Sequence, residues 1–208
     1  MIAWLKTEWH NLASKYGNDT LVEELWTEIY NNYNHKTRHY HNLSHICNML
    51  LQAEAYKAEI EDLEALQFGI WYHDIIYKSS KKDNEEKSAL FAEKRLNSIP
   101  FDKKRIEKVK KLIVSTKKHE LILRENEDNA ILLDLDLSIL GTDWETYQKY
   151  IANIRKEYKI YPDFMYKPGR KKVLKHFLDR ETLYFTHAFQ NKHEVQARKN
   201  LKKEIQLL

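Results

Sequence analysis

A histidine and an aspartate stand side by side in the apolar stretch WYHDIIY, residues 71–77. An isolated charge costs many kcal/mol to bury, so buried ionisable groups are normally paired with a partner or bound to a metal ion. His73 and Asp74 therefore predict either a metal site or a purely structural polar cluster at the end of a helix.

Two other apolar segments contain residues that can bind a metal ion. His45 lies in HNLSHICNML, and Asp134 and Asp136 lie in LLDLDLSIL. A divalent ion needs three or four nitrogen or oxygen ligands that converge from different elements. Asp134 and Asp136 are separated by about 200° around a helix, so only one of them is expected to face a shared ion.

The elements that must position these residues are predicted to be helices. Glycine and proline are scarce, with 4 and 3 residues, and long stretches have helical periodicity. The sequence predicts an all-α fold with helices over about 2–16, 19–33, 43–58, 60–74, 84–98, 102–118, 129–140, 144–161, 170–180 and 188–207. Gly141 is expected to end its helix in a left-handed cap, and PDFMYKPG, residues 162–169, is expected to be a loop.

Composition and charge limit the class of protein. The chain has 208 residues and no Pro/Gly/Ser-rich linker, which predicts one domain. Its net charge of +4 comes from interspersed charges of both signs, so nucleic acid is an unlikely partner. Cys47 is the single cysteine, and the N-terminus lacks the apolar run of a signal peptide. No run of about 18 apolar residues is present, so we expect a cytoplasmic protein that does not span a membrane.

The order of His45, then His73-Asp74, then an aspartate followed by leucine resembles the H…HD…D pattern of the HD superfamily of metal-dependent phosphohydrolases. The resemblance covers most of the chain and is carried by RHYHNLSHI, WYHDIIY, DNEEKSA, STKKH, DLDLSILG, IRKEY, GRKKVL and ARKNL. It implies an HD-type helical bundle with a core over about 35–142 and added helices at both ends, which would shape the substrate pocket.

The resemblance also implies a ligand set. Its pattern falls on His45, His73, Asp74 and Asp136. Asp134 is an alternative to Asp136, because the Leu-Asp-Leu pattern also fits around Asp134, although poorly. Two histidines and two carboxylates suit Mn²⁺, Fe²⁺, Zn²⁺, Co²⁺ or Ni²⁺ better than Mg²⁺. Asp74 is in addition the candidate to orient the attacking water.

Other residues are weaker candidates for the chemistry. The resemblance makes Glu85 a candidate general acid, whereas Glu86 has the spacing of a capping box with Asp83. His119 could contact phosphate or a second ion. His41 is a candidate for substrate binding, and the resemblance adds Arg155 and Arg170. Arg38 is a further arginine that could clamp a phosphate.

Together these features predict hydrolysis of a nucleotide or another small phosphorylated metabolite. A binding module that holds a metal or nucleotide without turnover is the main alternative. A di-iron oxygenase is a weaker one, because His41 and His119 are the only obvious additional ligands.

Overall fold

The computed structural model describes residues 1–125 and 127–208, which contain ten α-helices, one 3₁₀ helix and no strand. The all-α prediction is therefore confirmed. The elements are α1 (Ile2–Ala13), α2 (Asp19–Tyr33), α3 (Leu43–Ala55), α4 (Leu63–Tyr72), α5 (Asn84–Leu96), α6 (Lys103–Ser115), α7 (Asp128–Leu137), η1 (Ser138–Gly141), α8 (Trp144–Glu157), α9 (Asp163–Leu178) and α10 (His187–Leu207).

The chain divides into two compact units, residues 1–132 and 133–208. The boundary falls inside α7, so this one helix begins in the first unit and ends in the second. The predictions of a single domain over residues 1–208, with an HD-type core over about 35–142, stay predictions.

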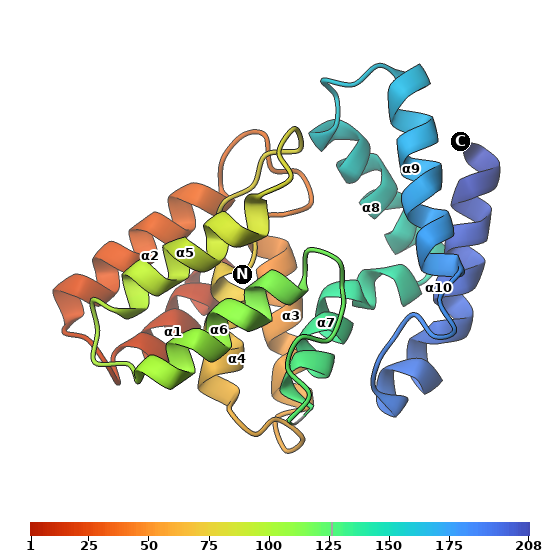
Figure 1. Ribbon diagram of the computed structural model, residues 1–208. Coiled ribbons are helices and arrows are strands. Elements are labelled where there is room, and N and C mark those ends of the chain that lie inside the picture. Colours follow the sequence, from red (N-terminus) through yellow and green to blue (C-terminus); the bar gives the residue numbers. More distant parts are fainter. Residues whose placement is uncertain (126) are drawn as a thin grey trace. The chain divides into compact units, whose positions relative to one another are not determined.

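The first unit is organised around α4, where α3, α5 and α6 all pack (Figure 1). Because α4 is apolar nearly all round, it is stable only at the centre of a core. Trp9 of α1 is fully buried and meets the ring of Trp71 edge-on, with 5.6 Å between ring centres. The C-terminal end of α4, where His73 and Asp74 follow, is thus held in a well-packed interior.

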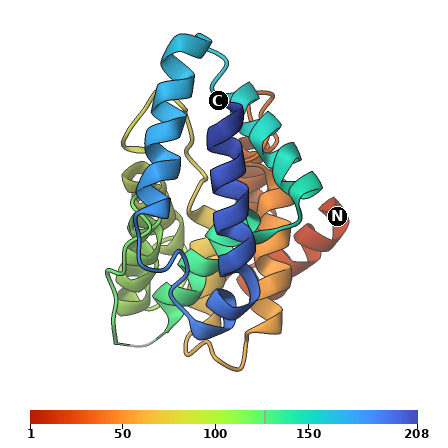
Figure 2. The same cartoon turned by 90° about the vertical axis from the view of Figure 1, so that its right-hand side faces the viewer.

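The second unit contains α8, α9 and α10. Helices α9 and α10 lie side by side (Figure 2). A buried ion pair joins them: Arg170 donates from Nε and Nη2 to the two carboxylate oxygens of Glu204, at 2.7 and 3.1 Å. Tyr147 of α8 donates its hydroxyl to the same carboxylate, so all three helices share one polar contact.

The predicted loop over residues 162–169 is wrong, because α9 begins at Asp163 and includes Pro168. Proline inside a helix removes one backbone donor and normally favours a break. Here Tyr166 is buried and Arg170 forms the ion pair with Glu204, and both contacts require helical spacing. Tertiary packing therefore outweighs the local preference for a turn.

The prediction of a left-handed cap at Gly141 is also wrong, since no glycine among the described residues has a positive φ. The helix tightens instead into the 3₁₀ turn η1. Glycine is required at this place because a Cβ atom would lie 2.5 Å from the Cβ of His193 and 2.9 Å from its backbone oxygen.

Among the described helices, none combines the length and the apolar character that crossing a bilayer requires.

Gly141 and Gly169 offer a matched pair for a stability test. Gly141→Ala is expected to lower the free energy of unfolding by about 1 to 3 kcal/mol, because backbone must shift to admit the methyl group. Gly169→Ala should raise it by about 0.5 to 1 kcal/mol, since this glycine lies inside α9 with nothing within 4 Å of the added carbon. Urea denaturation of both variants checks this, and equal effects would contradict the packing described for Gly141.

Candidate metal centre

His73 is held at the C-terminal end of α4 by two hydrogen bonds. Its backbone N–H donates to the carbonyl of Gly69, and its Nδ1 lies 2.9 Å from the carbonyl oxygen of Ile70. A carbonyl oxygen can only accept, so Nδ1 must carry the proton. In the neutral ring Nε2 is then unprotonated and can bind a metal ion.

His45 presents a second imidazole nitrogen to the same point. It is the third residue of α3, whose start is fixed by the side chain of Asn42 accepting a hydrogen bond from the Ser44 amide. The Nε2 atoms of His45 and His73 lie 3.2 Å apart, and both side chains are buried.

Asp74 adds an oxygen, because its Oδ2 lies 3.2 Å from Nε2 of His73. Ligand atoms that bind one ion at about 2.1 Å with angles near 90° to 109° are separated by about 3.0 to 3.4 Å. Both distances from His73 Nε2 fall within this range. The group of described residues whose ligand atoms all lie near one another contains His45 and His73 with Asp136, and it does not include Asp74.

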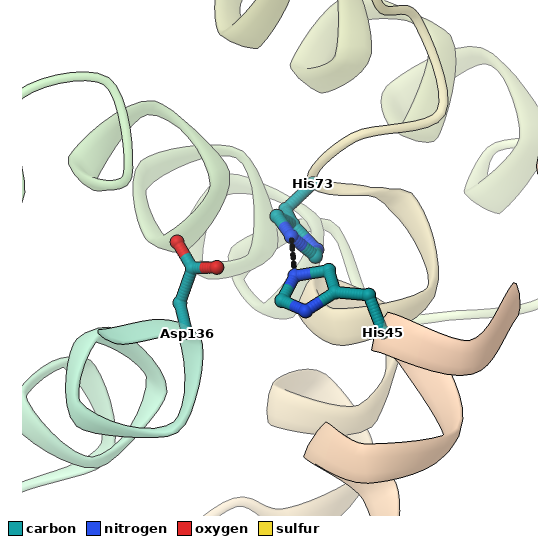
Figure 3. Close-up of side chains that lie close together, drawn as sticks. All are labelled: His45, His73 and Asp136. Carbon is teal, nitrogen blue, oxygen red and sulfur yellow. Dashed lines mark hydrogen bonds between the residues drawn. The ribbon is translucent and has the colours of Figure 1, made fainter. Parts of the chain in front are cut away.

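Asp136 belongs to α7, one turn beyond the part of that helix that lies in the first unit. His45, His73 and Asp136 each offer one ligand atom, and these atoms lie within 4.8 Å of one another. Figure 3 draws these three side chains, which lie close together.

Asp134, the alternative ligand, has a different environment. Its carboxylate accepts hydrogen bonds from the backbone amides of Phe185 and Thr186 and from the Thr186 hydroxyl, at 2.7 to 2.8 Å. Asp134 therefore anchors the segment that leads into α10. The predicted separation of the two aspartates around the helix explains why they have different partners.

Two polar residues that the sequence did not assign fix the segment after the dipeptide. Asn84 bonds through its side chain to both the amide and the carbonyl of Lys78. The Ser88 hydroxyl bonds to the amide and the carbonyl of Ile76. Asn84 and Ser88 are both buried and lie four residues apart on one face of α5. This spacing is the feature of the sequence from which they could have been predicted.

Glu85 lies between these two residues in sequence and is half-buried. Burial raises the pKa of its carboxyl above the usual value, and the charge of Asp74 raises it further. The pKa of its neighbour Glu86 is lowered, because Lys117 donates to its carboxylate. Glu85 thus keeps its proton to higher pH than Glu86 does.

The predicted capping box is absent, because the Asp83 side chain makes no cap hydrogen bond and pairs with Lys87.

His41 lies beside the ligand group and not within it. Its ring stacks on Tyr77 with 4.2 Å between ring centres, and its centre is 6.3 Å from that of His45. His119 follows α6 in a turn with a φ of 49°, an unusual conformation for a residue other than glycine.

The two arginines predicted to bind substrate have intramolecular partners in the second unit. Arg155 donates to the carbonyls of Tyr158 and Tyr161 and to the carboxylate of Asp163, so it closes the turn between α8 and α9. Arg170 is paired with Glu204 as described above, and its guanidinium also donates to the Tyr150 hydroxyl at 3.3 Å. Their roles in substrate binding stay predictions.

Comparisons with family models, with curated proteins and with solved structures found no match to this chain.

Proposed function

We propose that this protein is a metal-dependent phosphohydrolase of the HD type, which acts on a nucleotide or another small phosphorylated metabolite. The observation that carries the proposal is the 3.2 Å spacing of His45 Nε2 and Asp74 Oδ2 from His73 Nε2 inside a buried environment. The resemblance of WYHDIIY and its partner segments to the HD pattern supports the same conclusion.

In this proposal His45, His73, Asp74 and Asp136 hold one divalent ion. Two imidazoles and two carboxylates favour Mn²⁺, Fe²⁺, Zn²⁺, Co²⁺ or Ni²⁺ over Mg²⁺, which prefers oxygen ligands only. When bound, such an ion lowers the pKa of a coordinated water toward neutrality and so provides a nucleophile for attack on phosphorus.

The protein's own groups would then manage the protons. One oxygen of Asp74 can bind the ion while the other accepts the proton of the attacking water. Glu85, with its raised pKa, can give a proton to the oxygen that leaves phosphorus. In this proposal the Asp74 carboxylate accepts a proton and the Glu85 carboxyl donates one, because the two groups have different environments.

The first test is Asp74→Ala. This change removes a ligand and the group that orients water, so we expect loss of bound metal together with loss of phosphate release. Thermal stability should stay level or rise, because a carboxylate no longer has to be desolvated. Metal analysis, phosphate release from a panel of nucleoside monophosphates and a melting curve measure the three quantities.

Asp83→Ala is the matched control, since Asp83 is exposed and pairs with Lys87. It should keep both metal and activity. If instead Asp74 is structural, Asp74→Ala will keep its metal and lose about 1 to 3 kcal/mol of stability. That result would overturn the proposal, whereas a wild-type protein that binds metal without turnover would favour the binding module.

The second test uses the raised pKa of Glu85. A general acid works in its protonated form, so kcat should fall as pH rises through this raised pKa. Burial is the largest cause of the raised pKa of Glu85, and the charge of Asp74 is a smaller one. An ion that neutralises Asp74 would therefore lower this pKa in part and leave it above its usual value. Glu85→Gln should lower kcat by about 100- to 10,000-fold for a nucleoside monophosphate and abolish this decline with pH.

Two comparisons make the Glu85 test specific. The loss of kcat in Glu85→Gln should be much smaller for p-nitrophenyl phosphate, whose leaving group needs little protonation. Glu86→Gln, at the neighbouring carboxylate paired with Lys117, should leave the pH profile unchanged. A Glu85→Gln enzyme with the wild-type pH profile would show that another group is the acid.

A further inference from the structure

We propose that Tyr33 and Arg38 are positioning residues of the metal centre, which hold the backbone on both sides of Asp74 and so fix the direction of its carboxylate. This inference rests on the proposed function, because it assigns the two residues to the same ion site.

The end of α4 shows why such residues are needed. The last four carbonyls of a helix have no partner within it. Here Gly69 accepts from the His73 amide, Ile70 from the His73 ring, and Tyr72 from the Ile75 amide. The fourth carbonyl, of Trp71, accepts a hydrogen bond at 3.0 Å from the hydroxyl of Tyr33, which lies at the end of α2.

The same Tyr33 hydroxyl also accepts from the backbone amide of Asp74, at 3.3 Å. Tyr33 is fully buried, so no water competes for either bond. A single hydroxyl therefore connects the last turn of α4 to the amide of the proposed ligand.

Arg38 holds the other side of the Asp74 residue. Its Nη1 donates to the carbonyl of Asp74 at 2.5 Å and to that of His41 at 3.1 Å, and its Nη2 donates to the carbonyl of Ile75 at 2.8 Å. The sequence suggested Arg38 as a phosphate clamp, but these bonds direct its guanidinium to the backbone.

The guanidinium is itself held in place by aromatic rings. It lies 5.0 Å from the ring centre of Tyr33 and 5.6 Å from that of Tyr77. A planar group fixed in this way can satisfy several carbonyls at defined angles, which a flexible ammonium cannot. Both the amide and the carbonyl of Asp74 are thus bonded to side chains outside the helix.

The test measures metal binding and coordination geometry in Tyr33→Phe and Arg38→Lys. Tyr33→Phe keeps the buried ring and removes only the hydroxyl, so it preserves packing. Each variant is titrated with Co²⁺, and the visible absorption of the bound ion is recorded. We expect a Co²⁺ affinity about 10- to 100-fold below wild type, as for other residues that orient metal ligands, and an altered absorption band because Asp74 binds at a changed angle.

Arg198→Lys is the matched control. Arg198 also donates to three backbone carbonyls, those of Leu178, Arg180 and Glu181, but it belongs to α10 and holds the end of α9 and the segment that follows it. Its replacement should lower the melting temperature and leave the Co²⁺ affinity and spectrum unchanged. General destabilisation is thereby separated from positioning.

The outcomes distinguish this inference from the proposed function. Tyr33→Phe and Arg38→Lys with wild-type affinity and spectrum, in a protein whose wild type binds Co²⁺, would overturn the positioning role alone. A wild type that binds no Co²⁺ would overturn the proposed function, and the positioning role with it.

Discussion

The hydrogen bond between Nδ1 of His73 and the carbonyl of Ile70 is the interaction on which the site depends. It satisfies a carbonyl at the end of α4, and it also decides which ring nitrogen remains free of a proton. Without it the imidazole could rotate or adopt the other tautomer, and the spacing to His45 and Asp74 would be lost. The same bond helps to end the helix and fixes the orientation of the His73 ring.

The surroundings of this bond are built to keep the end of α4 rigid. Packing of α3, α5 and α6 on α4 leaves its last turn little room to move. Side chains from α2 and α5 then hold the backbone that follows, through Tyr33, Asn84 and Ser88. A buried histidine and aspartate are costly for a fold. A metal ion bound by His73 and Asp74 together would offset the cost of burying them at the end of α4.

Much of the fold could be predicted from the sequence, because periodicity and capping residues act locally. Asn18, Asn42 and Asp102 each accept hydrogen bonds at the helix starts that the pattern predicts. The failures have tertiary causes. Residues 162–169 are helical because of what Tyr166 and Arg170 contact, and Gly141 is needed because His193 lies against it. Tyr33 was not assigned a role because its partner Trp71 is 38 residues away.

That His45, His73 and Asp136 belong together was predicted from residue types, apolar context and resemblance, whereas the spacing of their ligand atoms required the structure. X-ray absorption spectroscopy of the Zn²⁺-loaded wild-type protein tests the central claim most directly. We expect one ion with two imidazole nitrogens and carboxylate oxygens at about 2.0 to 2.2 Å. A spectrum without imidazole scattering, or a protein that binds no ion, would contradict it.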